Sequence, residues 1–311
     1  MNSMLTHQVK VIVNPMASGG VTRIKWIHIR RLLDKAKLKY DYQFTERPGH
    51  ATDLARDAVR QGYRQVIAVG GDGTIHEVVN GLIDKSGRSE AGLGIISTGT
   101  GNDFARSIGT LGTYRKTVGR LAMSAEKEID VGIVGYRNSS GRETRRIFIN
   151  MAGVGFDAAV LRATKKRFRV VSHIPYWISG VYTYAKYKPT QVTINIDGKI
   201  EKKRAMGVIL NNGYSFAGGM RMAPGADMAD GLFDTIVLGD INPLEFIKGL
   251  SMVYKGTLGD HRKVDTYKAK SIAIDAKAPL YLQADGELLG QVPASFRVLP
   301  RALRIAVYSE S

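Results

Sequence analysis

The sequence predicts an α/β protein in which a doubly wound parallel-sheet domain is followed by a mostly antiparallel β-sandwich domain. As far as about residue 125, short runs rich in β-branched residues alternate with segments of helical period, whereas from Glu128 onward most segments resemble strands. Alternating strands and helices favour a parallel sheet covered on both faces, while consecutive strands favour antiparallel pairing.

The first half contains four predicted strands with helices between and after them. Apolar runs place the strands near residues 9–14, 40–45, 65–70 and 92–97. Helical periods place helices near 20–37, 50–61, 74–84, 102–108 and 113–123. The third helix is the best marked, because Ile75, Val78, Val79 and Leu82 recur at helical spacing directly after a strand.

The second half contains seven predicted strands and one well-marked helix. Strand patterns cover residues 130–136, 146–151, 191–196, 205–211, 231–238, 267–274 and 280–284. The helix has Asn242 as its predicted N-cap, Pro243 in its first turn, Glu245 three residues after the cap, and Gly256 beyond its end.

A glycine-rich turn joins the third strand to the third helix. Gly70, Gly71 and Gly73 surround Asp72 there, and glycines let a ligand approach bare backbone at a helix start, where the free N–H groups favour an anion. A phosphate group is the predicted guest. The alternative needs no ligand, because Thr74 and Glu77 have the spacing of a capping box.

Two further strands also end in turns of this kind. Residues 9–15 run into Ser18, Gly19 and Gly20, and residues 93–97 run into a turn containing Gly99 and Gly101. Carboxyl ends of neighbouring parallel strands meet at one edge of a doubly wound sheet. We therefore expect the three turns to form one anion-binding crevice.

Composition narrows the class of protein. The 311 residues include no cysteine, which excludes disulfides, thiolate metal sites and thiol nucleophiles. No run of about eighteen apolar residues and no secretory leader are found, so a cytoplasmic protein is expected. The net charge of +17 fits either nucleic acid or an anionic membrane surface.

The densest basic cluster favours the membrane. Arg162, Lys165, Lys166, Arg167 and Arg169 precede residues 175–189, where Trp177 and several tyrosines lie between two prolines. Aromatic rings with polar tips settle at the level of lipid headgroups, so this block predicts a short interfacial helix. A solvated basic loop beside a partly buried helix is the alternative.

Four motifs, taken in order, resemble the diacylglycerol kinase catalytic-domain family, which includes bacterial soluble lipid kinases and the sphingosine and ceramide kinases. The motifs are Asn14-Pro15, residues 70–74, residues 99–106 and Asp285-Gly286-Glu287. The resemblance implies ATP and Mg²⁺ as cofactors. The nucleotide-binding residues that it implies are Asn14, Pro15, Ser18, Thr45, Gly70, Gly71, Asp72, Gly73, Thr74, Glu77, Thr100 and Asn102.

The resemblance also implies the catalytic acids. Phosphoryl transfer needs held phosphates and a placed hydroxyl, so Asp72 is expected near the phosphates and their metal. Glu287 is implied as the general base and Asp285 as a second acid facing the metal. From the residues alone, Asp-Gly between apolar segments predicts a type I′ hairpin turn instead.

A structural magnesium site is implied at residues 227–232. Asp230 would supply a carboxylate, while Asp227 and Leu232 lie at positions that supply further oxygens, Leu232 through its backbone. Asp130 is either linked to that site through water or is simply a polar residue before a strand.

These inferences combine into one expected function. We expect an ATP- and Mg²⁺-dependent lipid kinase that phosphorylates a lipid hydroxyl, with diacylglycerol as the expected substrate and phosphatidate as the product. Residues 1–127 and 288–311 would form the nucleotide-binding domain, and residues 128–287 the lipid-substrate domain. The protein would work at the inner membrane surface, touching anionic lipid and no nucleic acid. An NAD kinase-like enzyme, a basic nucleic-acid-binding protein and a homodimer remain open alternatives.

Overall fold

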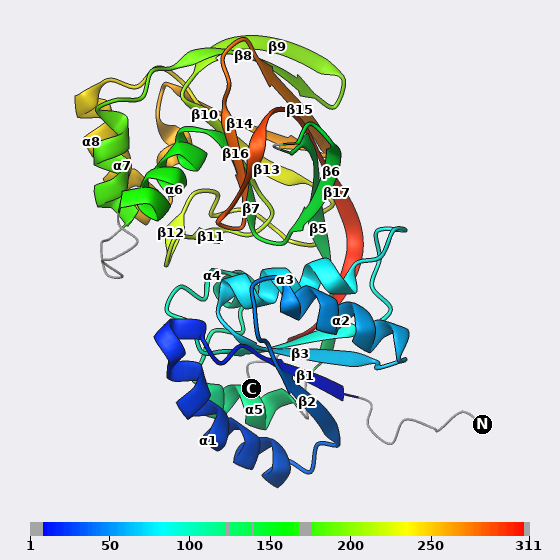
Figure 1. Ribbon diagram of the computed structural model, residues 1–311. Helices are drawn as coiled ribbons and strands as arrows, with labels where there is room; N and C mark the ends of the chain where they lie inside the picture. The colour runs from blue at the N-terminus through cyan, green and yellow to red at the C-terminus, as the bar shows by residue number, and fades with distance from the viewer. Residues whose placement is uncertain (1–8, 122–124, 139, 168–175, 308–311) are drawn as a thin grey trace. The chain divides into compact units, whose positions relative to one another are not determined.

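The computed structural model describes residues 9–121, 125–138, 140–167 and 176–307. Contacts divide the chain into two compact units, residues 1–131 with 299–311, and residues 132–298. The predicted fold class is confirmed, because the first unit is built on parallel strands and the second is rich in antiparallel strands (Figure 1).

The first unit is a parallel sheet in the order β17-β4-β3-β1-β2. Its strands are β1 (Val9–Val13), β2 (Tyr40–Phe44), β3 (Gln65–Gly70), β4 (Gly92–Ser97) and the end of β17 (Glu287–Val307). Each strand that runs through the middle of the sheet is almost wholly buried, as expected when helices cover both faces.

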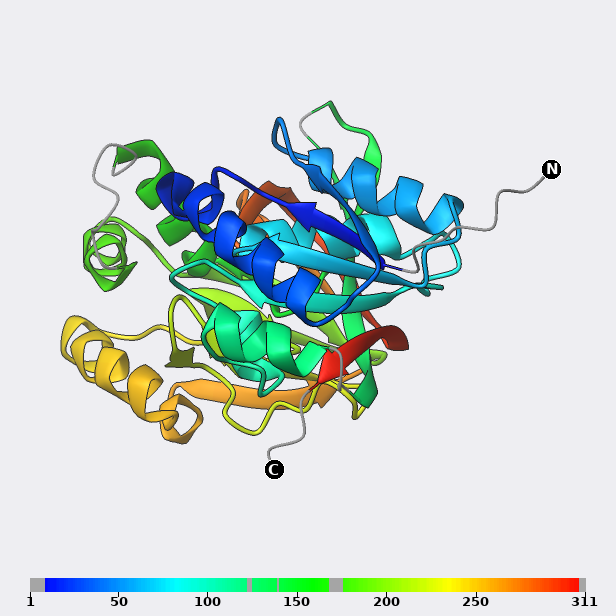
Figure 2. The ribbon, with the colours of Figure 1, turned by 90° about the horizontal axis from the view of Figure 1, so that it is seen from below.

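Helices cover the two faces of this sheet in pairs. A core cluster joins Trp26, Ile29 and Leu33 of α1 (Val21–Lys35) to Val118 and Leu121 of α5 (Tyr114–Leu121) on one face. These two helices lie in front of the sheet when it is seen from below (Figure 2). The other pair, α2 (His50–Arg60) and α3 (Asp72–Leu82), packs together on the opposite face (Figure 1). The helices α4 (Asp103–Ser107) and η1 (Ala17–Gly20) are short.

The second unit contains two β layers and a helical layer. One layer has the order β14-β13-β10-β7-β16, and the other contains β17, β15, β8, β9, β5 and β6. The bounds are β5 (Ala125–Arg137), β6 (Glu143–Phe148), β7 (Met151–Gly155), β8 (Thr190–Ile196), β9 (Lys199–Ala205), β10 (Gly207–Asn211), β13 (Phe233–Leu238), β14 (Val264–Ala269), β15 (Ser271–Ala276) and β16 (Tyr281–Ala284). The ribbon β11 (Ser215–Phe216) with β12 (Met220–Arg221) and the turn η2 (Leu258–Asp260) complete it.

Alternation along β10 shows how the layers pack. Val208 and Leu210 point into the core between the two β layers, which also contains Ile194 of β8 and Ile272 of β15. Ile209 points the other way, into a second core. Three helices cover that second core: α6 (Phe156–Arg167), α7 (Tyr176–Tyr184) and α8 (Pro243–Lys255).

Two predicted strands are each split in two. Residues 267–274 form the end of β14 and the start of β15, because the N–H groups of Lys270 and Ser271 donate to Asp197 at 3.0 and 2.7 Å instead of continuing a ladder. Residues 146–151 break at Ile149 and Asn150 between β6 and β7. In the part of the chain that the structure describes, no helix is long and apolar enough to cross a bilayer.

Candidate active site

The three glycine-rich turns predicted to converge do lie together at the carboxyl ends of β1, β3 and β4. The Asn14 amide Nδ2 donates to Thr74 Oγ1 at 2.9 Å. The Thr98 N–H donates to the Gly70 carbonyl at 2.8 Å, and Ser18 Oγ donates to the Thr98 carbonyl at 2.8 Å. Side chains and backbone of all three turns are therefore bonded into one cluster.

At two positions of the cluster, neighbouring atoms come so close to the backbone that only glycine fits. A Cβ atom on Gly70 would lie 2.4 Å from Thr74 Oγ1, and one on Gly99 would lie 2.8 Å from the Cα of Gly71. A Cβ on Gly73 would meet nothing within 4 Å. Packed backbone on one side and open space at the first turn of α3 form a cradle for an anionic group.

The alternative explanation of this turn, a capping box formed by Thr74 and Glu77, is wrong. The N-cap of α3 is Gly71, and no side chain caps it. The Glu77 carboxylate instead accepts hydrogen bonds from the N–H groups of Gly49 at 2.9 Å and Ala51 at 3.2 Å, at the start of α2. It therefore stabilises a neighbouring helix, and the nucleotide contact implied for Glu77 would have to compete with these bonds.

Two carboxylates point at the same glycine. A Cβ atom on Gly101 would lie 2.9 Å from Asp72 Oδ2 and 3.5 Å from Asp103 Oδ2. Asp72 Oδ1 also accepts the Phe104 N–H at 3.2 Å, which ties the second turn to the third. Asp103 was not among the predicted site residues, although it directly follows Asn102 in the motif at residues 99–106. A pair of carboxylates beside a phosphate cradle fits a nucleotide-bound Mg²⁺.

Polar groups around this cluster also fit a phosphate-bearing ligand. Two buried polar atoms, Ser97 Oγ and Asn102 Oδ1, have no hydrogen-bond partner among the described residues. The ammonium of Lys25 lies 3.4 Å from the Thr98 carbonyl oxygen, so α1 contributes a cation that no local pattern predicted.

The remaining predicted nucleotide-binding residues lie near the same strand ends. Thr45 donates its N–H to the Val13 carbonyl at 2.9 Å, and Thr100 is exposed. Pro15 is half-buried after β1.

The second unit contains the predicted acidic hairpin. Asp285 and Gly286 have φ values of 45° and 81° between the paired residues Ala284 and Glu287, so the type I′ hairpin turn is confirmed. The Asp285 carboxylate accepts three backbone N–H groups between β6 and β7, from residues 149, 150 and 151 at 2.7, 2.9 and 3.0 Å. Asp285 thus fixes the position of the hairpin.

Glu287 lies at the start of β17 and is partly exposed. Its Oε2 forms an ion pair with Nη2 of Arg146 at 2.5 Å. Burial raises the pKa of the nearby Tyr136 phenol; the positive charge of Arg146 opposes this rise and the negative charge of Glu287 adds to it. On the same turn, Lys165 of α6 donates its ammonium to the Gly286 carbonyl at 2.8 Å.

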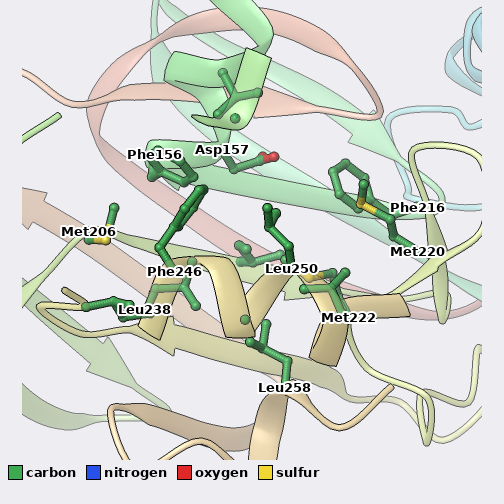
Figure 3. Close-up of a pocket in the computed structure, with 16 residues that line it drawn as sticks. Phe156, Asp157, Met206, Phe216, Met220, Met222, Leu238, Phe246, Leu250 and Leu258 are labelled. Atoms are coloured by element: carbon green, nitrogen blue, oxygen red, sulfur yellow. The ribbon is translucent and has the colours of Figure 1, made fainter. Parts of the chain in front are cut away.

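An apolar cavity of about 100 Å³ lies in the second core, between the sheet and the helices (Figure 3). Most of its lining is aromatic, aliphatic or methionine, including Phe156, Phe246 and Met206. One carboxylate borders it, that of Asp157, which is 6% exposed. The buried Gln283 donates Nε2 to Asp157 Oδ2 at 2.6 Å and accepts the Gly286 N–H at Oε1 at 2.9 Å. Sequence reasoning did not predict this link.

The predicted magnesium residues lie on one turn, where three of their four carboxylate oxygens already accept hydrogen bonds or an ion pair. Asp230 Oδ2 pairs with the Lys268 ammonium at 2.9 Å, and Asp230 Oδ1 accepts the Leu232 N–H at 3.0 Å. Asp227 Oδ1 accepts the Ala229 N–H at 3.0 Å. Among the described residues, no three acidic or histidine side chains are grouped as metal ligands. This turn, as arranged, does not fit a resident Mg²⁺.

Glycine-rich turns at the ends of parallel strands, followed by a unit of antiparallel β layers with an acidic hairpin, are the arrangement expected of a two-unit kinase. Residues 8–134 match the family described as "Diacylglycerol kinase catalytic domain". Residues 150–307 match the "YegS C-terminal NAD kinase beta sandwich-like domain". The chain belongs to the diacylglycerol kinase family, and it is a lipid kinase.

Relatives align along nearly the whole chain. The diacylglycerol kinase of Staphylococcus saprophyticus is 30% identical over 97% of this chain and 95% of its own length. That of Bacillus subtilis is 28% identical over 97% of each chain. A solved structure of a diacylglycerol kinase from Bacillus anthracis has a TM-score of 0.72 at 22% identity, covering 97% of each chain. Yeast NADH kinase complexed with NADH has a TM-score of 0.52 at 12% identity, covering 98% of this chain and 84% of its own, a likeness of fold alone.

Proposed function

We propose that this lipid kinase transfers the γ-phosphoryl group of ATP, with Mg²⁺, to the hydroxyl of diacylglycerol and so forms phosphatidate. The observation that carries the lipid acceptor is the apolar cavity of the second unit (Figure 3). A nicotinamide dinucleotide would place phosphates and hydroxyls against a cavity wall whose described residues are apolar apart from one carboxylate. The hydrocarbon of an acyl chain matches that apolar wall. The names of the relatives favour diacylglycerol among lipids.

The size of the cavity has a consequence for how a chain would enter. At about 100 Å³ it holds a few carbons without rearrangement. Four lining positions are adaptable: Met206, Met220, Met222 and Leu250. Methionine has three rotatable bonds and repacks readily, so a longer acyl segment would be accommodated by side-chain movement.

The nucleotide would be held by the first unit. The bare backbone at Gly71 and Gly73 would receive phosphate oxygens, and Lys25 would add positive charge. Asp72 and Asp103 are the residues that would hold Mg²⁺. When bound, the ion would neutralise charge on the phosphates.

Glu287 is proposed as the base that accepts the hydroxyl proton. The acceptor oxygen would form a bond to the γ-phosphorus as the bond to the β–γ bridging oxygen breaks and ADP leaves. The proton would pass to the Glu287 carboxylate, whose orientation is fixed by Arg146. Gln283 and Asp285 would position the hairpin that carries this base.

We also propose peripheral contact with an anionic membrane, at its cytoplasmic face. The helix α6 exposes Arg162 and Lys165. Residues 168–175 lie outside the described chain, and for Lys166, Arg167 and Trp177 only the helical backbone is described. The predicted interfacial helix at residues 175–189 therefore remains a proposal, as does a homodimer.

The test is a kinase assay with a lipid panel. The chain is incubated with ATP, Mg²⁺ and either short-chain diacylglycerol, long-chain diacylglycerol, other lipid alcohols or NAD, and the phosphorylated product is identified. We expect phosphatidate. Product from NAD and from no lipid would overturn the proposal.

A cavity-filling variant tests where the acyl chain binds. Gly249 lines the cavity from α8, and a Cβ there would meet only Leu258 Cδ1 at 3.9 Å. Gly249→Leu should raise KM for long-chain diacylglycerol more than for the short-chain substrate, with KM for ATP unchanged. Gly119→Leu, at an exposed helical glycine of α5, is the matched control. Equal kinetics of the parent and Gly249→Leu on both chain lengths would remove the cavity from the proposal.

A further inference from the structure

The helix α8 presents apolar side chains on two opposite faces. Its inner face lines the cavity with Phe246, Leu250 and Val253. On its outer face Leu244 and Ile247 are 77% and 57% exposed. A soluble helix normally turns polar side chains outward, so large apolar residues at this spacing on one exposed face mark an interaction surface.

The same outer face is basic and extends further along the helix. Exposed Lys248 and Lys255 lie on it, together with Tyr254, which is 51% exposed. Apolar side chains interleaved with lysines and a tyrosine are the composition of helices that lie in the interface of an anionic bilayer. A second copy of the chain would bring the same lysines, and like charges would oppose its docking here.

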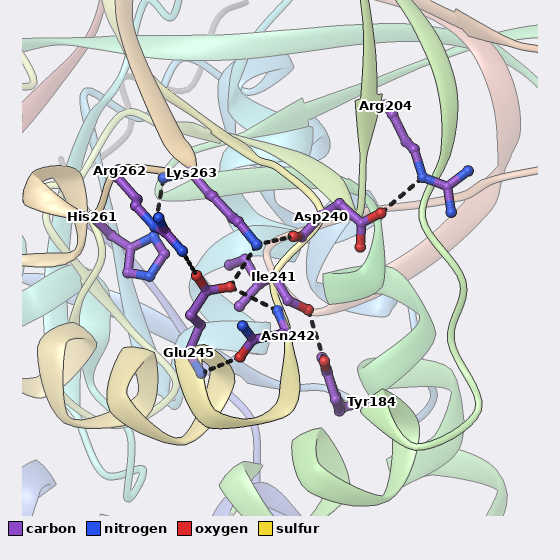
Figure 4. Close-up of polar contacts among 9 residues, drawn as sticks. All are labelled: Tyr184, Arg204, Asp240, Ile241, Asn242, Glu245, His261, Arg262 and Lys263. Atoms are coloured by element: carbon purple, nitrogen blue, oxygen red, sulfur yellow. Dashed lines mark hydrogen bonds and ion pairs between the residues drawn. The ribbon is translucent and has the colours of Figure 1, made fainter.

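The helix is held firmly at its N-terminus, so this exposure belongs to an ordered element (Figure 4). The predicted capping box of Asn242 and Glu245 is confirmed, with both bonds at 2.9 Å. The Glu245 carboxylate also pairs with Arg262 and Lys263, each at 2.7 Å. These contacts hold the pKa of Glu245 down at about 2.

The helix α7 continues the surface. Its Tyr184 ring stacks on Phe246 of α8 with centroids 4.3 Å apart. The Tyr184 hydroxyl donates to the Ile241 carbonyl at 2.7 Å (Figure 4). Ile178 and Val181 of α7 are 36% and 38% exposed. The two helices over the cavity therefore both offer apolar side chains to solvent.

We propose that the outer face of α8, formed by Leu244, Ile247, Lys248, Tyr254 and Lys255, docks into the interfacial layer of an anionic bilayer. This proposal rests on the proposed lipid-kinase function. It adds an apolar anchor on α8, which lies outside the basic segment at residues 162–188. Docking here places the wall of the acyl cavity at the membrane, so the lipid would pass from bilayer to cavity along α8.

The absence of cysteine from the chain allows a direct test. Ile247→Cys is labelled with an environment-sensitive dye and mixed with phosphatidylglycerol–phosphatidylcholine vesicles. Ile200→Cys is the matched control, because Ile200 lies on β9 and is 64% exposed. We expect a blue shift and brighter emission at position 247 only. Vesicle-bound protein with no response at position 247, or with equal responses at both positions, would overturn the proposal.

An affinity measurement supplies a second readout. Leu244→Asn with Ile247→Asn should weaken vesicle binding about tenfold or more, because two apolar anchors are lost, while Ile200→Asn leaves it unchanged. Kinetics on monomeric short-chain diacylglycerol should be the same for the parent, the double variant and Ile200→Asn. Unchanged vesicle binding by the double variant, or loss of a dimer in its place, would contradict membrane docking. If the dye responds at position 247 but no lipid is phosphorylated, the docking surface stands and the proposed acceptor fails.

Discussion

Gln283 Nε2 donates a hydrogen bond to Asp157 Oδ2 at 2.6 Å, so one buried amide side chain contacts both the wall of the apolar cavity and the acidic hairpin. The other end of that amide accepts the N–H of Gly286 at 2.9 Å. A side chain that is 2% exposed thereby links the place proposed for the acyl chain to the turn that carries the proposed base.

Replacing Gln283 by Leu should destabilise the protein by about 1–3 kcal/mol, because a buried carboxylate loses a donor and a backbone N–H loses an acceptor. Turnover should fall as the hairpin loosens. Urea unfolding and initial rates would measure the two effects. Gln191→Leu, at an exposed position of β8, should stay within about 0.5 kcal/mol of the parent. Equal stability of the two variants would show that the link contributes nothing.

Replacing Glu287 by Gln should reduce turnover by about 10²–10⁴-fold, because the shape is kept and the proton acceptor is lost. ATP affinity and the unfolding midpoint should change little. The control is Glu143→Gln on β6, the strand that also carries Arg146. Full activity of Glu287→Gln would remove Glu287 from the chemistry.

Acid should weaken the anchoring of α8. The pKa of Glu245 is held at about 2 by Lys263, the Asn242 N–H and Arg262, below the usual 4.5. A lowered pKa means that the ionised group stabilises the fold above the usual value and that this contribution is lost as the pH falls from about 4.5 toward 2. The Tm of the parent should therefore drop more steeply than that of Glu245→Gln over this range. Parallel curves would contradict the assignment.

Magnesium at residues 227–232 would have to displace an ammonium. The Lys268 side chain pairs with Asp230 and Asp234 at 2.9 and 3.2 Å. We therefore expect Mg²⁺ to raise the Tm of Lys268→Met more than that of the parent, and to leave the Tm of Asp230→Asn unchanged. Differential scanning fluorimetry with and without Mg²⁺ measures this. If Mg²⁺ raises the Tm of none of the three proteins, residues 227–232 do not bind magnesium.

The sequence predicted the parallel sheet, its three converging turns and the capped helix α8, because each depends on local period, glycine placement or capping residues. It did not predict α6, whose residues 156–167 mix apolar and basic side chains without a clear stripe. Nor did it predict β9, whose sequence Lys-Ile-Glu-Lys-Lys-Arg-Ala is dominated by charged side chains.

The remaining differences between the predicted and observed elements come from hydrogen bonds between residues far apart in the sequence. Asp285 takes the N–H groups of residues 149 and 150 and so ends a predicted strand from more than a hundred residues away. Asp130, left open between a magnesium role and a structural one, is fully buried and accepts the Arg301 N–H at 2.7 Å. Such partners are set by tertiary packing, which no local pattern encodes.

The strand β17 has a consequence for the order in which the protein is made. Its early residues pair with β16, and near its end Ile305 pairs with Leu93 of β4, which completes the parallel sheet. During translation, β4 is synthesised some two hundred residues before Ile305, the residue of β17 that pairs with it. The nascent first unit must therefore keep one side of β4 unpaired during synthesis, and contacts this distant in sequence form slowly. Premature termination shortly before residue 299 would leave a lipid kinase with an open sheet edge, a hazard for aggregation.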